Sequence, residues 1–125
     1  MIALPGGTYW MGSSDHYPEE APARQVRVDP FEVDETPVTN RAFATFVAAT
    51  GHVTLAEIAP DASDYPGADP AMLRAGSSLF VRPERPTPPT DPFAWWRFSF
   101  GTDWRHPWGP ESSIEGLEDH PVVHV

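Results

Sequence analysis

The chain has 125 residues, 40% of them hydrophobic, which suffices for one modest domain with a core. Its formal net charge of −10 repels phosphate backbones and anionic lipids, so neither nucleic acid nor a membrane surface is an expected partner. The sequence contains no cysteine, which excludes disulfides, thiolate metal ligands and cysteine nucleophiles within these residues.

The first third of the chain carries regular alternation of apolar and polar side chains. Residues 2–4 and 8–11 alternate on either side of Pro5-Gly6-Gly7, which predicts two short strands joined by a tight turn. The alternation in residues 25–33 shifts its phase by one at Pro30, which predicts a strand with a bulge or break there. No basic segment followed by a long apolar run opens the chain, so we expect no signal peptide and a cytoplasmic location.

One helix is predicted, from about Asn40 to Thr50. Thr39 is the expected N-cap and Gly51 the expected residue just past the helix end. Apolar residues recur on one face of this helix at the spacing of a single narrow stripe. The stripe comprises Phe43, Phe46 and Val47. Another part of the protein must cover it.

The segment from His52 to Phe100 is poor in regular pattern. Sixteen prolines and nine glycines in the chain predict short strands, few helices and much ordered loop. Residues 82–90 read as a solvated linker, whereas the apolar residues 78–81 and 93–98 indicate that the surrounding chain is anchored at intervals. For residues 82–90, a solvated linker and an anchored segment both remain possible interpretations of the sequence.

The histidines of residues 120–125 invite a metal hypothesis. His120 and His124 have the H-x-x-x-H spacing that would place both imidazoles on one face of a helix. Pro121 and the neighbouring valines favour an extended segment instead, where four residues span about 13 Å, too far for one ion. The alternative is that these histidines orient a strand by hydrogen bonds. This apolar run also suggests that the sequence is cut short.

Several segments together resemble a known family. Residues 2–13, 20–26 and 35–40 resemble the opening of the sulfatase-modifying-factor superfamily. Other segments resemble the formylglycine-generating branch in particular. They are Gly51-His52-Val53-Thr54 with Ala56-Glu57, Gly101-Thr102-Asp103-Trp104-Arg105-His106-Pro107 with Gly109-Pro110, Ser112-Ser113-Ile114, and residues 119–125. The resemblance implies an α+β, C-type-lectin-like fold with little regular secondary structure. It also implies that residues 1–125 are the N-terminal portion of a single domain, incomplete at the C-terminus.

The function that the resemblance implies is oxidation of a cysteine in a Cys-x-Pro-x-Arg segment of a sulfatase to formylglycine. The family is implied to use molecular oxygen and a copper ion held by two cysteines, and to bind calcium. We expect those ligands to lie beyond these residues, so no catalytic residue, metal ligand or bound cofactor is assigned to this chain. The alternatives are a non-catalytic C-type-lectin-like binding module of the same superfamily, or an unrelated small domain.

The densest aromatic and polar stretch supplies the candidate substrate-binding residues. They are Asp103, Trp104, Arg105 and His106. Trp104 offers a flat apolar surface for the proline of a Cys-x-Pro-x-Arg peptide, and Asp103 or Trp104 offers a partner for its arginine. In the alternative interpretation Trp104 is a buried core residue and Arg105 pairs with an acid such as Glu111 or Asp119.

Overall fold

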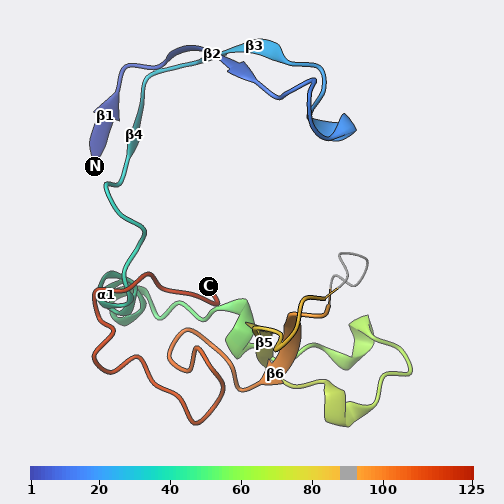
Figure 1. Cartoon of the computed structure of the whole chain (residues 1–125). Coiled ribbons are helices and arrows are strands. Elements are labelled where there is room, and N and C mark those ends of the chain that lie inside the picture. Colours follow the sequence, from blue (N-terminus) through green and yellow to red (C-terminus); the bar gives the residue numbers. More distant parts are fainter. Residues whose placement is uncertain (88–92) are drawn as a thin grey trace. The chain divides into compact units, whose positions relative to one another are not determined.

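The computed structural model describes residues 1–87 and 93–125, which form two compact units, residues 1–37 and 38–125 (Figure 1). The end of the predicted linker at 82–90 lies outside the described residues, and residues 82–87 hold neither helix nor strand. Mixed short helices and small antiparallel sheets agree with the expected α+β class and its low content of regular structure. No helix in the two described stretches is long and apolar enough to cross a membrane.

The first unit is an antiparallel ribbon of four short strands. Strand β1 (Ile2–Leu4) pairs with β4 (Phe31–Val33), and β2 (Gly7–Met11) pairs with β3 (Arg24–Val28). The expected strands are confirmed, but the expected turn that would pair β1 with β2 is wrong. The chain does not reverse direction at residues 5–6. Strands β1 and β2 therefore form one arm of the ribbon, and each pairs with a strand of the other arm, β3 and β4.

The interruption in this ribbon is a break and not a bulge. Leu4 faces Phe31 and Gly7 faces Val28, so two residues on one arm lie opposite two on the other and the register is unchanged. Proline cannot donate to a ladder, and both interrupted segments contain one. Gly6 has φ +72°, and a Cβ there would lie 2.4 Å from the Val28 carbonyl oxygen, so the close approach of the arms requires glycine.

Helix α1 (Asn40–Thr50) opens the second unit and confirms the predicted boundaries. The Thr39 hydroxyl accepts a hydrogen bond from the Ala42 N–H at 3.2 Å, and Gly51 is left-handed at φ 69° with its N–H bonded to the Val47 carbonyl at 2.8 Å. These are the two signals on which the prediction depends. Of the apolar stripe, Phe43 is buried whereas Phe46 is 45% exposed.

Replacing the N-cap should weaken this helix measurably. Thr39→Ala removes the acceptor for the Ala42 N–H, and we expect it to lower the free energy of unfolding by about 1 kcal/mol. Urea denaturation followed by far-ultraviolet circular dichroism measures the change. Thr45→Ala, in the middle of the same helix, is the matched control and should have a smaller effect. Equal effects of the two substitutions would contradict a capping role for Thr39.

The segment after residue 113 is tied to the start of α1. Backbone N–H groups of Asn40 and Arg41 donate to the carbonyls of His120 and Glu118, both at 2.9 Å, which satisfies donors that a helix start otherwise leaves free. The strand expected over residues 120–125 is wrong, because only a single bridge forms, between Thr39 and Pro121. His124 turns the backbone out of the extended region with φ 60°.

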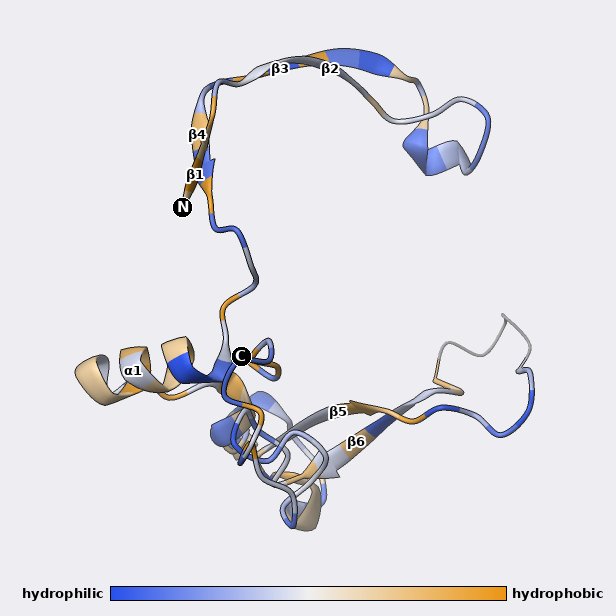
Figure 2. Cartoon of the chain, turned by 60° about the vertical axis from the view of Figure 1, so that its left-hand side comes forward, coloured by the Kyte–Doolittle hydropathy of each residue, from blue (hydrophilic) through white to orange (hydrophobic). Residues whose placement is uncertain are grey.

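The remaining sheet is a hairpin of β5 (Gly76–Phe80) and β6 (Trp96–Phe100). Its strands overlap the two apolar segments, residues 78–81 and 93–98, that were expected to anchor this part of the chain. Short 3₁₀ helices precede it, η2 (Leu55–Glu57), η3 (Ala62–Asp64) and η4 (Pro70–Met72), and η1 (Pro18–Glu20) lies in the first unit. Figure 2 shows apolar residues recurring along α1, β1 and β5. Among described residues, the buried hydrophobic side chains are Phe43, Ala56, Leu79 and Trp104.

Candidate functional site

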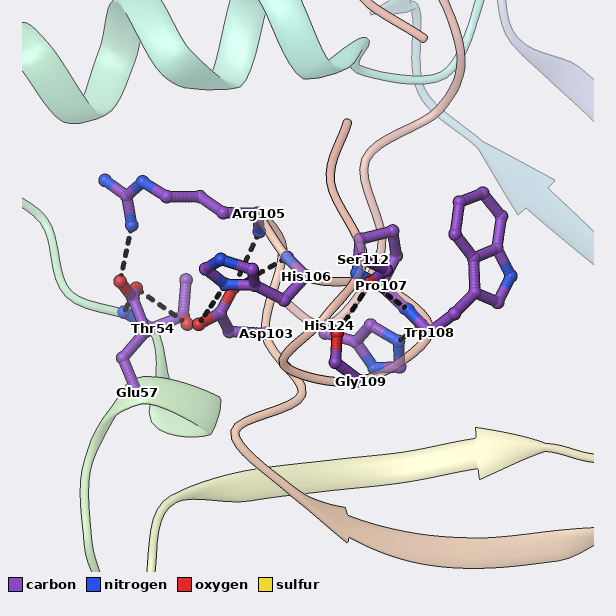
Figure 3. Close-up of polar contacts among 10 residues, drawn as sticks. All are labelled: Thr54, Glu57, Asp103, Arg105, His106, Pro107, Trp108, Gly109, Ser112 and His124. Carbon is purple, nitrogen blue, oxygen red and sulfur yellow. Dashed lines mark hydrogen bonds and ion pairs between the residues drawn. The ribbon is translucent and has the colours of Figure 1, made fainter. Parts of the chain in front are cut away.

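The candidate residues lie on the loop that follows β6, and Asp103 organises that loop (Figure 3). Its carboxylate oxygen Oδ1 accepts hydrogen bonds from the N–H groups of Arg105 and His106, at 2.7 and 2.9 Å. The same oxygen lies 3.0 Å from Nδ1 of the His106 ring. An aspartate that bonds backbone groups two and three residues ahead fixes a tight turn, so Asp103 determines how Arg105 and His106 are presented.

Trp104 lies beneath this turn with only 3% of its surface exposed. Its ring packs edge-on against Phe43, with centroids 5.1 Å apart and planes at 83°. The Arg105 guanidinium also lies over this ring, 4.1 Å from its centroid. This is the environment of the core alternative, and direct contact of Trp104 with a peptide stays a prediction that this burial does not support. Its indole N–H is buried with no hydrogen-bond partner among the described residues.

Arg105 is held over Trp104 by Glu57. The guanidinium lies 2.6 Å from the Glu57 carboxylate, so the expectation that Arg105 pairs with an acid is confirmed. The two acids named as examples, Glu111 and Asp119, are wrong, because η2 presents Glu57 to the loop and Asp119 pairs with Arg41 at 3.1 Å.

Glu57 is itself fixed by Thr54. Its second carboxylate oxygen accepts from the Thr54 N–H at 2.9 Å and from the Thr54 hydroxyl at 3.0 Å. Partial burial of Glu57 opposes its ionisation, but the hydrogen bonds from Thr54 and the charge of Arg105 outweigh that burial. The pKa of Glu57 therefore lies below its ordinary value.

This pKa shift gives stability a defined dependence on pH. Because the pKa of Glu57 is lower in the folded than in the unfolded chain, its contribution is full above the unfolded pKa and is lost as pH falls through the folded pKa. We expect the free energy of unfolding to fall less steeply for Glu57→Gln than for the unaltered chain between about pH 6 and about pH 3. Glu111→Gln, at an exposed position, should follow the unaltered chain. Parallel profiles for all three proteins would contradict this role of Glu57.

Both ring nitrogens of His124 lie within hydrogen-bond distance of residues elsewhere in the chain. Its Nδ1 lies 2.9 Å from the Ser77 hydroxyl and its Nε2 lies 3.1 Å from the Pro107 carbonyl oxygen. A carbonyl only accepts, so Nε2 carries a proton. Both ring nitrogens are thus engaged in orienting the chain, as the hydrogen-bond alternative predicted for His124. Residues 1–87 and 93–125 contain no group of three or more His, Cys, Asp or Glu side chains placed to hold a metal ion.

Thr54 and Glu57 are parts of the site that were not among the residues predicted for it, although the sequence contains a signal for them. Thr54-x-x-Glu57 is the spacing in which a helix-start side chain and an acid three residues later satisfy each other's backbone. That pattern fixes Glu57 locally, but not the contact with Arg105, which is 48 residues away.

Comparison with known proteins decides the family. Residues 1–125 match the family described as the sulfatase-modifying factor enzyme 1-like domain. The chain belongs to this family. Formylglycine-generating enzymes of Mycobacterium tuberculosis and Thermomonospora curvata are 46% and 42% identical to it, over all of this chain but only 42% and 39% of their own lengths. The "Inactive C-alpha-formylglycine-generating enzyme 2" of Bos taurus is 35% identical, again over the whole chain and 39% of that relative.

This sulfatase-modifying-factor chain thus spans about two fifths of the length of the curated relatives it matches. The copper site implied by the resemblance needs two cysteine thiolates, and the chain has none. Its residues therefore do not fit that site, and no chemical step is assigned to them.

Proposed function

We propose that this chain is part of a formylglycine-generating oxidase that acts on the cysteine of a Cys-x-Pro-x-Arg segment in a sulfatase polypeptide. The observation that carries the proposal is the 46% identity to the formylglycine-generating enzyme of Mycobacterium tuberculosis along all 125 residues. In this proposal the chain is the N-terminal portion of a single C-type-lectin-like domain, and the copper-binding cysteines and calcium ligands lie in the rest of it. A cytoplasmic location stays a prediction.

Within this proposal, the Asp103 turn forms part of the surface that receives the peptide. The side chains of Arg105 and His106 are 44% and 40% exposed, so both present polar groups to a bound chain. Asp103 sets their positions, and it remains the acidic partner proposed for the arginine of the peptide. Trp104 supports the turn from beneath.

A non-catalytic module of the same family is the second candidate. It is favoured by the 35% identity to a relative whose name includes the word inactive, which also covers the whole chain. The two candidates differ in chemistry and not in the fold of residues 1–125, since relatives of both kinds match all of them.

A chimera tests whether residues 1–125 provide the peptide surface that the first candidate requires. Residues 1–125 would replace the matched region of the Mycobacterium tuberculosis relative, and a Cys-x-Pro-x-Arg peptide would be followed by mass spectrometry. We expect the cysteine to be converted to formylglycine, as by the unaltered relative, because the proposed peptide surface is retained. A chimera that folds, as judged by circular dichroism, but converts no peptide would contradict the proposal and favour the non-catalytic module.

A further inference from the structure

Glu57 and Thr54 belong to the candidate site, but the proposed function gives them no role. Figure 3 shows the Glu57 carboxylate between Thr54 and Arg105. Its Oε1 accepts from Nη1 of Arg105 at 2.6 Å, and its Oε2 accepts from the N–H and the hydroxyl of Thr54 at 2.9 and 3.0 Å. Because Thr54 fixes one carboxylate oxygen, the other oxygen is held toward Arg105.

Arg105 is fixed at three points along its length. Its backbone N–H donates to Asp103, its guanidinium carbon lies 4.1 Å from the centroid of the Trp104 ring, and its Nη1 donates to Glu57. A free arginine side chain samples many rotamers, and a ligand that binds it must offset the entropy of ordering it. These three contacts order the guanidinium before a ligand binds, so Arg105 is preorganised.

The Arg105 guanidinium has further N–H groups that it can donate. Arginine carries five N–H donors in one plane, and within residues 38–87 and 93–125 only Nη1 of this guanidinium has a hydrogen-bond acceptor. A Cys-x-Pro-x-Arg segment is rich in acceptors, because each residue contributes a backbone carbonyl while its proline has no N–H to donate. A planar group of donors is therefore the chemistry that suits the backbone of such a segment.

Glu57 also balances the charge of Arg105. Burial opposes the ionisation of Glu57, but the hydrogen bonds from Thr54 and the charge of Arg105 hold its pKa below the ordinary value, so the carboxylate is ionised at neutral pH. An unpaired Arg105 would repel the arginine of a Cys-x-Pro-x-Arg segment. The ion pair leaves the donors of Arg105 in place and removes that repulsion.

We propose that Glu57 is a positioning residue for peptide binding and that it acts through Arg105. Glu57 holds the guanidinium where its remaining N–H donors meet backbone carbonyls of the Cys-x-Pro-x-Arg segment, and it cancels the positive charge of Arg105. Glu57 itself needs no contact with the peptide. The proposal rests on the proposed function, in which the Asp103 turn receives the peptide, and it adds a reason why a basic, proline-containing segment is accepted.

The chimera with the Mycobacterium tuberculosis relative provides the test. Its Kd for a fluorescent Ser-x-Pro-x-Arg peptide, in which serine replaces the cysteine so that nothing is oxidised, is measured by fluorescence anisotropy. We expect Glu57→Gln to raise this Kd about tenfold, because glutamine keeps the shape of glutamate but loses its charge. Asp119→Asn is the matched control, since it removes the carboxylate partner of another arginine, Arg41, and it should leave the Kd unchanged. Circular dichroism checks that each variant is folded.

A double-mutant cycle separates action through Arg105 from an independent role of Glu57. Arg105→Ala alone should weaken binding at least as much as Glu57→Gln, and the double variant should bind no more weakly than Arg105→Ala. Arg105→Lys keeps the charge but loses the planar donors, so it should also raise the Kd, and it tests the same contact if Glu57→Gln does not fold.

Three results would overturn the role of Glu57. They are an unchanged Kd in Glu57→Gln, losses that multiply in the double variant, and an unaltered chimera with no affinity for the peptide. Conversion of the cysteine-containing peptide is followed separately. An unaltered chimera that binds the peptide but yields no formylglycine contradicts the proposed oxidation, and the Kd values of its variants still decide the role of Glu57.

Discussion

Trp104→Ala should lower the free energy of unfolding of the second unit by about 3–5 kcal/mol. The substitution removes a ring that is 97% buried, packs edge-on against Phe43 and lies under the Arg105 guanidinium. Small domains are stable by only about 5–15 kcal/mol, so this loss would be a large fraction of the total stability. Urea denaturation followed by circular dichroism measures it.

Trp108→Ala is the matched control for this experiment. Trp108 lies four residues further along the same loop and is 65% exposed, so its removal should change the free energy of unfolding by no more than about 0.5 kcal/mol. If Trp104 were instead a peptide-binding surface, Trp104→Ala would leave stability unchanged and weaken binding of a Cys-x-Pro-x-Arg peptide. Comparing the two tryptophan variants therefore shows whether Trp104 is a core residue or a peptide-binding residue.

Local signals in the sequence predicted local structure well. The boundaries of α1 depend on Thr39, which accepts a hydrogen bond from the N–H three residues ahead, and on Gly51, because a glycine adopts a left-handed backbone at little cost. Each signal acts within one helical turn, so no knowledge of the rest of the fold is needed. The predictions of fold class and family likewise depended on short motifs. The match over residues 1–125 confirms the family.

Contacts between distant segments were beyond the same reasoning. The segment Pro5-Gly6-Gly7 predicts a turn that would pair β1 with β2. Whether the chain turns there or continues depends on the pairing of Leu4 with Phe31, 27 positions away. The partner of Arg105 is another example. Glu57, Glu111 and Asp119 are all acids, and only the position of η2 selects Glu57. The residue types alone do not show which tryptophan of the aromatic stretch is buried, because the burial of Trp104 depends on its contact with the distant Phe43.

The 125-residue chain alone should produce no formylglycine. The oxidation implied for the family passes through cysteine thiolates that hold copper, and this chain contains no cysteine. Histidine, aspartate and glutamate side chains cannot substitute for them, because soft thiolates are what select and retain copper in its reduced form. Incubation with a Cys-x-Pro-x-Arg peptide, copper and oxygen should therefore leave the cysteine unchanged by mass spectrometry, while the Mycobacterium tuberculosis relative converts it under the same conditions. The chimera with that relative is the decisive comparison, since it changes no residue of this chain. Formylglycine produced by the chain alone would move the chemistry into residues 1–125 and refute the division of labour proposed above.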